Sequence, residues 1–353
     1  MPSKVYFSSS RASSKLNGIK KLERLFNRAG LGSLFGRGDR TAVKVHWGEP
    51  GNTAFVAVPF VRKLTSLVAA TGARPFVTDT NTLYTGMRHD AIINIEAAAM
   101  NGFTRESMGA PVIVADGLVG ADAVPVPVNG RFVKEAKIAG AIHHAQAMLV
   151  VSHFKGHVLF SFGAAIKNLG MGCATSAGKH VLHCDVKPTV DKKLCRGDSI
   201  CIRHCPAKCI SLDGDMKAVI DHERCIGCGE CVVVCPERAM PVNWKASSEA
   251  LQGKTAEYAL AAVQNKPGKV GYVNFLTRIT TDCDCADWSD NPLVQDIGYL
   301  ASTDPVAIDQ ASIDLFNAAA ALPDSDLGGR PASKDKLRAL RPSIDYEIIL
   351  RHA

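Results

Sequence analysis

Short apolar runs alternate with stretches of helical periodicity along the first half of the chain. Residues 41–47 alternate between apolar and polar side chains as a half-buried strand does, and the apolar residues of 55–71 recur at the spacing of one helix face. Further predicted elements are strands over 74–78, 111–115 and 148–151 and a helix over 88–101. The repeated alternation predicts an α/β fold with a layered, mostly parallel sheet.

This pattern is interrupted at residues 188–241, where cysteines become dense, and then resumes. The elements predicted beyond it are a helix over 255–265, strands over 269–275 and 297–301, and a helix from Pro305 to about 321. This last part has too few strands to close a core of its own. We therefore expect residues 1–187 and 242–353 to form one discontinuous α/β host domain and 188–241 to be an inserted domain. The alternative is three consecutive domains.

Composition narrows the class of protein. The 353 residues are 46% apolar, enough for a large core, and the net charge of +7 comes from basic residues spread along the chain. Nucleic-acid binding is not expected, because it needs basic residues concentrated on one face. No apolar run has the length of a membrane span, and the first residues lack the apolar segment of a signal peptide. We predict a cytoplasmic protein whose 12 cysteines are reduced thiols.

The most specific motif is formed by Cys225, Cys228, Cys231 and Cys235, followed by Pro236. Their spacing, C-x2-C-x2-C-x3-C-P, is that of a bacterial iron–sulfur loop. Three closely spaced thiolates can hold three corners of one cubane, while the fourth points elsewhere. Zinc is the main competitor, but it more often takes two separated C-x2-C pairs. The motif therefore predicts an iron–sulfur cluster, which favours an anaerobic or low-oxygen setting.

A second, less regular copy of the motif lies upstream. Cys195, Cys201, Cys205 and Pro206 match the same spacing, and Asp198 stands where the second cysteine is expected. The pair of motifs resembles a two-cluster ferredoxin, in which the fourth cysteine of each motif ligates the other cluster. The resemblance implies two interlocked [4Fe-4S] clusters. Its implied ligands are Cys225, Cys228, Cys231 and Cys205 for cluster one, and Cys195, Cys201 and Cys235 with Asp198 for cluster two.

Asp198 makes the second of these sites irregular. A carboxylate is a poor substitute for a soft thiolate, so it either binds one iron weakly or leaves that corner to water. Cluster two is therefore expected to have one non-cysteine ligand or to be a [3Fe-4S] cluster. Cys209 is either a spare ligand or a plain buried thiol. Residues 188–243 carry eight Lys/Arg and eight Asp/Glu, a balance that suits a module docked on its own host.

Polar residues gather in loops at the ends of predicted strands, where open α/β sheets place their ligands. The candidate catalytic residues are Lys44, His46, His153, His157 and Lys167. Converging on one cleft, they can bind an anionic substrate or a metal. Cys283 and Cys285 form a C-x-C pair just past a predicted strand. Together with a histidine from another loop, this pair predicts a further metal site. The alternative interpretation is that both cysteines are simply buried thiols.

Several long stretches together resemble one family of iron–sulfur proteins. They are KVHWGEPGN at 44–52, VTDTNTLYTG at 77–86, FKGHVLFSFGAAIKNLGMGCA at 154–174, NFLTRITTDCDC at 274–285 and DIGYLASTDPVAIDQAS at 296–312. The chain is similar, over nearly its whole length, to the family called domain of unknown function 362. The resemblance implies one domain interrupted by a ferredoxin module. It implies no substrate.

Two functions of different class follow from these observations, and a third ranks below them. The first is an iron–sulfur electron-transfer protein, in which paired clusters pass electrons between a redox partner and a site in the α/β domain. The second is an oxidoreductase with its own substrate or metal pocket there. The third is a metal or cluster carrier. The expected partner is a redox protein or a small-molecule substrate. The sequence is compatible with a homo-oligomer and with a subunit of a larger complex.

Overall fold

Seven strands form one central sheet in the computed structural model, which describes residues 3–84, 86–183, 187–225, 227, 229–241, 247–330 and 333–353. Their order is β1-β13-β12-β7-β2-β3-β4. The five strands from β12 to β4 are parallel, and β13 pairs antiparallel with both neighbours. The predicted α/β class with a mostly parallel sheet is confirmed. The strands are β1 (Tyr6–Ser9), β2 (Arg40–Lys44), β3 (Arg74–Asp79), β4 (Val112–Val114), β7 (Ala147–His153), β12 (Val270–Leu276) and β13 (Gly298–Ser302).

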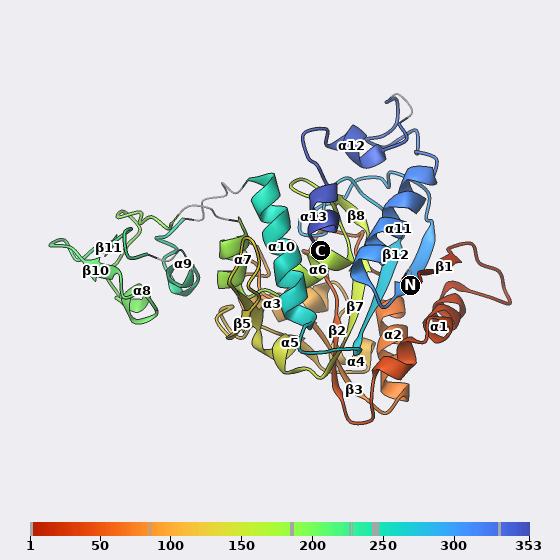
Figure 1. Cartoon of the computed structure of the whole chain (residues 1–353), viewed down its shortest axis with the longest axis horizontal. Coiled ribbons are helices and arrows are strands. Elements are labelled where there is room, and N and C mark those ends of the chain that lie inside the picture. The colour runs from red at the N-terminus through yellow and green to blue at the C-terminus, as the bar shows by residue number, and fades with distance from the viewer. Residues whose placement is uncertain are drawn as a thin grey trace.

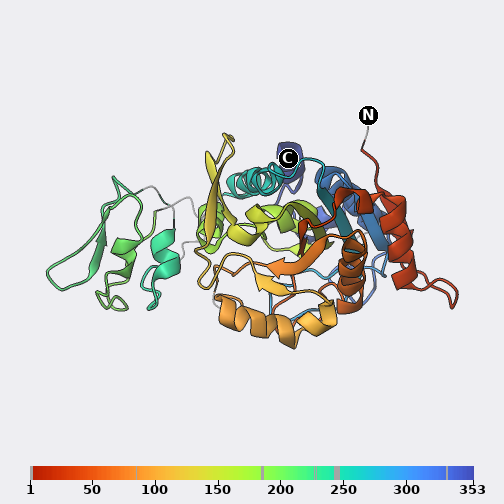
Figure 2. The ribbon, with the colours of Figure 1, turned by 90° about the horizontal axis from the view of Figure 1, so that it is seen from below.

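Helices cover both faces of this sheet (Figures 1 and 2). Successive residues of β7 point to opposite faces, so Met148 and Val150 enter one core whereas Leu149 and Val151 enter the other. The helices of the first core are α5 (Gly140–His144), α6 (Ala165–Gly170), α10 (Ser248–Val263), α11 (Pro305–Ala318) and α13 (Glu347–His352). Those of the second are α1 (Gly18–Arg28), α2 (Val58–Ala70), α3 (Ala91–Met100) and α4 (Arg105–Met108), together with the turn η1 (Leu31–Leu34). The smaller α12 (Lys336–Leu340) lies at the edge of the first core.

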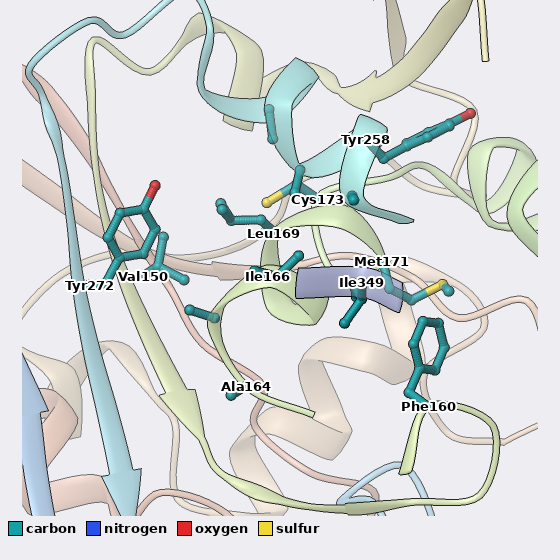
Figure 3. Packing of buried hydrophobic residues seen from close by; sticks show 14 of the residues in the cluster. Val150, Phe160, Ala164, Ile166, Leu169, Met171, Cys173, Tyr258, Tyr272 and Ile349 are labelled. Atoms are coloured by element: carbon teal, nitrogen blue, oxygen red, sulfur yellow. The ribbon is translucent and has the colours of Figure 1, made fainter. Parts of the chain in front are cut away.

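The first core is built around the short helix α6. Ile166 and Leu169 of this helix pack among residues of the sheet, such as Val150 and Tyr272, and residues of α10, such as Tyr258 (Figure 3). All five are buried or nearly so. α6 has only six residues, and its polar Lys167 and Asn168 line the cavity. Such a short helix does not show the apolar periodicity by which helices are recognised in a sequence.

Each element predicted for the host has a counterpart in the structure. α10 begins seven residues earlier than expected, because the Ser247 side chain accepts a hydrogen bond from the Ala250 N–H (3.2 Å) and caps the helix there. The pattern did not predict β1, α1, α6, α7 (Ser176–His183) or two hairpins. The hairpins are β5–β6 (Ala123–Pro127 and Glu135–Ala139) and β8–β9 (Lys155–His157 and Ser161–Gly163). Among the described residues, no helix is both long and apolar enough to span a bilayer.

The cysteine-rich stretch lies to one side of the sheet (Figures 1 and 2). Its described residues form α8 (Ile200–Arg203), the hairpin β10–β11 (Ile210–Leu212 and Ala218–Ile220) and α9 (Glu230–Val234). They have a small hydrophobic cluster of their own, which includes Cys195, Cys201 and Cys231. The division at 187/188 and 241/242 stays a prediction.

A buried carboxylate fastens the two halves of the host to each other. Asp309 of α11 accepts hydrogen bonds from the backbone N–H groups of Ala165 (2.8 Å) and Ile166 (2.9 Å) at the start of α6. It also accepts one from Asn274 of β12 (2.8 Å), and its side chain is fully buried. The first turn of α6 precedes the cysteine-rich stretch, and Asp309 follows it. Two donors that precede the stretch and one donor that follows it therefore share the carboxylate of Asp309 as acceptor.

Replacing Asp309 with alanine leaves these donors buried without a partner. We expect Asp309→Ala to lower the free energy of unfolding by about 1–3 kcal/mol. Asp314→Ala on the same helix is the control, because Asp314 is exposed and its side chain accepts a hydrogen bond from Gln310, one turn earlier on the helix. Thermal unfolding followed by circular dichroism compares the two variants. Equal melting temperatures for them would show that Asp309 does not fasten the halves.

Candidate functional site

A cavity of about 230 Å³ opens at the carboxyl ends of the parallel strands. The chain continues from β2 to β3 and β4 on one side, whereas β7 and β12 lie on the other side of β2. The order of the strands thus reverses between the neighbouring strands β2 and β7. Such a position is a topological switch point, and open α/β sheets bind ligands there, outside the carboxyl ends of the strands. Lys44, Asp79 and His153 are the last residues of β2, β3 and β7, and the last two line the cavity.

Asp284 is the central charge beside this cavity. Its fully buried carboxylate lies 2.8 Å from Nδ1 of His153, 3.3 Å from Nζ of Lys155 and 3.9 Å from Nδ1 of His46. Burial alone would raise the pKa of Asp284, but His153 and Lys155 lower it well below its usual value. Nε2 of His153 faces the Thr277 carbonyl at 2.9 Å, so both ring nitrogens face acceptors. Asp284 is therefore an ionised carboxylate that holds three cationic or polar side chains in place.

The two residues that flank Asp284 form a group with one histidine. The ligand atoms of His157, Cys283 and Cys285 all lie within 4.8 Å of one another, and this is the single such group of at least three His, Cys, Asp or Glu residues in the described part of the chain. His157 belongs to β8 and reaches the cysteine loop because Gly156 has no side chain. The Gly156 N–H donates to the Thr280 carbonyl (2.8 Å), and a Cβ there would lie 2.0 Å from the Thr281 oxygen. Two thiols and an imidazole are a ligand set for a transition metal.

The protonation of His157 and Cys283 suits metal binding. Burial and then the charge of Lys167 lower the pKa of His157 to about 4, so the ring is neutral at pH 7. The Cys285 thiol donates to Cys283 and, with Lys167 and Lys155, holds the pKa of Cys283 well below its ordinary value against the effect of burial. Neutral imidazole and thiolate are the forms that ligate. His157 and Cys285 line the cavity, so a metal held there would face it.

Lys44 and Asp79 form a buried ion pair next to the cavity. Lys44 Nζ lies 2.8 Å from Asp79 Oδ1 and donates to Asn168 Oδ1 (2.7 Å). Asn168 in turn donates to the Val151 carbonyl (3.1 Å) and to Ser152 Oγ (3.0 Å). Lys44 is fully buried and is absent from the lining of the cavity. Its place is behind the wall, where it holds β2, β3 and α6 together.

Arg88 completes the wall on the side of β3. Its Nε donates to Glu49 Oε2 (2.9 Å), its Nη1 lies 3.0 Å from His46 Nε2, and its Nη2 donates to the Tyr84 hydroxyl. Burial and then Arg88 lower the pKa of His46 to about 3, so this ring is neutral. The guanidinium thereby has a protein partner at each of its three nitrogens.

Two further lysines line the cavity without a carboxylate in direct contact. Lys167 of α6 has Cys283 Sγ at 4.0 Å and lies over the Phe160 ring at 5.6 Å. Lys179 of α7 donates to Thr80 Oγ1 and to the Ala174 carbonyl, both at 2.6 Å. Burial lowers the pKa of Lys179, and the buried carboxyl of Asp116 opposes that effect. His183, one turn after Lys179, also lines the cavity.

The structure thus brings most of the candidate residues to one place. His46, His153, His157, Lys167 and Cys285 line the same cavity, and Lys44 and Cys283 lie directly behind its wall. Sequence reasoning assigned no role to Asp284, Arg88, Tyr84 or Asp116. Asp284 had a signal, because it stands between the two cysteines, whereas the other three follow no recognisable motif.

The described cysteines of the inserted stretch fall into two groups. Cys205, Cys209, Cys225 and Cys231 surround a small hollow of about 10 Å³, and the Sγ atoms of Cys205 and Cys209 lie 3.5 Å apart. Cys195, Cys201 and Cys235 form the other group. All three belong to the small hydrophobic cluster of this stretch. Burial raises the pKa of Cys201, and the charges of Cys235, Asp198 and Cys195 raise it further. The predicted ligand Cys228, and Cys184, lie outside the described residues.

None of the cysteines that the structure describes forms a disulfide. The backbone N–H groups of Ala218 and Ala239 donate to Cys195 Sγ (3.3 Å) and Cys235 Sγ (3.4 Å). Asp198 Oδ1 accepts from the Ile200 N–H (3.0 Å). Free sulfurs that already accept backbone hydrogen bonds suit thiolate ligands of a cluster, because such bonds stabilise negative charge on sulfur.

The cysteine-rich stretch contacts the host through helix α7. A Cβ added at Gly229, which has φ +75°, would lie 2.6 Å from Cγ of His180, so the ring packs directly on this glycine. His180 also has the Gly227 backbone as a hydrogen-bonding partner and is buried. Nearby, Lys137 Nζ lies 2.5 Å from Glu230 Oε1. Gly229 and Glu230 are thereby held beside α7, the helix that carries Lys179 and His183.

A second cavity, of about 470 Å³, lies at this junction. Its lining includes Cys235, Val232 and Met240 from the cysteine-rich stretch. From the host it includes Thr82, Leu83 and Tyr84, which also line the first cavity. One short loop therefore separates the two spaces.

Comparison of the sequence with known protein families identifies the family of this chain. The profile described as domain of unknown function 362 (DUF362) matches residues 41–314, more than half of the sequence. The chain belongs to the DUF362 family. This match contains β2 to β12, the cysteine-rich stretch and both halves of the metal-ligand group. The family resemblance expected from the sequence is confirmed.

No protein of curated function matches the sequence of this DUF362 protein. Among solved structures, it is similar to the lactate racemase apoprotein from Thermoanaerobacterium thermosaccharolyticum, with a TM-score of 0.38 and 9% sequence identity. The similarity covers 72% of this chain and 49% of the racemase. The DUF362 chain thus spans about half the length of that protein.

Removing the two sulfurs tests the metal group. We expect the Cys283→Ser/Cys285→Ser double variant to lose the zinc that the wild-type chain takes up after its inserted cysteines have been filled with iron and sulfide, because serine is a poor ligand for a soft metal. The measurement is zinc content by mass spectrometry after gel filtration. Cys173→Ser is the control: burial raises the pKa of this thiol to about 11, so it is not a thiolate at pH 7. Unchanged zinc in the double variant contradicts the assignment.

Proposed function

We propose that this protein is an iron–sulfur redox protein in which the cysteine-rich stretch exchanges electrons with the cavity of the α/β domain. The proposal joins the two leading hypotheses from the sequence: paired clusters that carry electrons, and a metal or substrate pocket in the host. The observation that carries it is the contact between Gly229 and His180, because it holds the main cysteine motif on the helix that lines the cavity.

The residues present fit two clusters of the ferredoxin type. Cys205, Cys225 and Cys231 of the first group would hold cluster one with Cys228. Cys195, Cys201 and Cys235 would hold cluster two, with Asp198 at the irregular corner. Bound to these thiolates, the clusters supply one electron at a time. The grouping of Cys205 with the downstream motif and of Cys235 with the upstream one supports the interlocked arrangement of a two-cluster ferredoxin.

The cavity fits a transition-metal ion as the place where electrons are used. His157, Cys283 and Cys285 would hold the ion, and three protein ligands leave a coordination position for a substrate. Asp284 lies between the cysteines, and its contacts to His153 and Lys155 orient the loop. Apolar side chains such as Val158 and Leu159 line the same space. Such a preformed site with few polar groups suits an oxidoreductase.

Asp198→Cys tests the clusters and their asymmetry together. We expect the wild-type chain, isolated without oxygen, to contain reducible clusters with fewer than the about eight irons of two complete cubanes, and the variant to approach that number. A thiolate also donates more electron density to iron than a carboxylate or water does, so the reduction potential of the second cluster should fall. Iron and sulfide analysis and electron paramagnetic resonance before and after dithionite measure both effects.

Asp215→Cys is the matched control, because Asp215 is an exposed carboxylate of the same stretch that lies outside both motifs. It should change neither iron content nor potential. A wild-type chain with no reducible cluster would refute the proposed function. Complete cubanes with the same reduction potentials in wild type and variant would refute only the irregular corner.

Gly229→Ala tests the contact between the cysteine-rich stretch and the host. The new Cβ meets the His180 ring, so we expect α7 to become more exposed and its amides to exchange faster with deuterium. Gly227→Ala is the control: Gly227 also has a positive φ, of +70°, but no atom lies within 4 Å of the added Cβ. Both variants carry the same backbone strain. Equal exchange of peptides from α7 in the two variants would contradict the docking.

A further inference from the structure

We propose that the cavity binds a small organic monoanion, a carboxylate, with Lys167 as its counter-charge and Lys179 as a second donor. The inference rests on the proposed function, because it names the class of substrate for the same cavity. It follows from the charges that surround the cavity and from the chemistry of its walls.

Most cations around the cavity already have a carboxylate partner. Lys44 is paired with Asp79 (2.8 Å), Arg88 with Glu49 (2.9 Å) and Lys155 with Asp284 (3.3 Å). Lys167 differs, since no ion pair joins it to a carboxylate in the described part of the chain. Its polar neighbour there is Cys283 Sγ, at 4.0 Å. The Lys167 ammonium therefore faces the cavity without a carboxylate partner among the described residues.

The contacts of Lys167 among the described residues are long. Its Nζ lies 4.0 Å from Cys283 Sγ and 5.6 Å from the centre of the Phe160 ring. An ammonium group in a largely apolar cavity is costly without a counter-ion. A bound anion would supply that counter-ion.

Lys179 provides a second donor in the lining of the cavity. An ammonium has three donors, and Thr80 Oγ1 and the Ala174 carbonyl accept two of them. Lys179 also lines the cavity, so one donor is left for a ligand. Lys167 and Lys179 come from different helices, α6 and α7. Together they can bind two oxygens of one carboxylate.

Size and polarity favour a carboxylate over a phosphate. The volume of about 230 Å³ is below the roughly 300–1,000 Å³ of sites for drug-sized ligands. Phosphate sites commonly use a bidentate arginine, but the guanidinium of Arg88 is already bound by Glu49, His46 and Tyr84. The remaining lining includes Leu83, Val158, Leu159, Ala164 and Met171. These side chains suit a short hydrocarbon attached to the charged group.

Calorimetry with propionate and propionamide tests the inference. The two molecules have nearly the same shape and differ in charge, so we expect the anaerobically isolated full chain to bind propionate at least about tenfold more tightly at constant ionic strength. Lys167→Met should abolish this preference, because methionine fills similar space without charge, and Lys167→Arg should retain it. Lys20→Met, on the exposed side of α1, should behave as the wild type.

Equal binding of the two molecules, absence of binding by propionate, or an unchanged preference in Lys167→Met would each overturn the inference. Inorganic phosphate is the second probe: tighter binding of phosphate than of propionate would also overturn it. Calorimetry requires no electron transfer. Failure of this test is therefore distinct from failure to find reducible clusters, which would refute the proposed function instead.

Discussion

The cost of burying an ionised carboxylate governs the arrangement of this site. Asp284 is completely buried, and such a charge is stable only when cations or donors surround it. His153 from the end of β7 and Lys155 from β8 meet that need. Because Cys283 and Cys285 are its neighbours in the chain, the contacts that neutralise Asp284 also present both sulfurs to His157. The contacts of the Asp284 carboxylate with His153 and Lys155 thus position the group formed by His157, Cys283 and Cys285.

The same constraint recurs in the rest of the α/β domain. Asp79 is matched by Lys44, Glu49 by Arg88, and Asp309 by backbone donors of α6. Each of these contacts joins segments that are far apart in the sequence. Polar interactions therefore determine which loops meet at the switch point, whereas the two hydrophobic cores determine only that the helices cover the sheet.

Sequence patterns predicted the sheet well because buried strands and amphipathic helices have distinct periods. They failed for α6, which has only six residues, and for β8, whose residues Lys155, Gly156 and His157 lack any apolar alternation. The positions of predicted strand ends identified Lys44, His46 and His153 as candidate site residues. The C-x-C spacing identified Cys283 and Cys285 as candidate metal ligands. Arg88 and Asp116 had no signal, because their role depends on partners that only the folded chain brings close. The cluster ligands remain predictions from spacing, and Cys228 lies outside the described residues.

The order of the strands has a consequence for how the chain is made. β12 pairs with both β7 and β13, yet its residues follow the whole cysteine-rich stretch in the sequence. During synthesis from the N-terminus, β7 has therefore no partner on one side until that stretch has left the ribosome. The cysteines of this stretch leave the ribosome while the edge of β7 is still unpaired. Cys283 and Cys285 are synthesised more than a hundred residues after His157, the third member of their group. Synthesis of the thiol-rich stretch thus precedes completion of the central sheet.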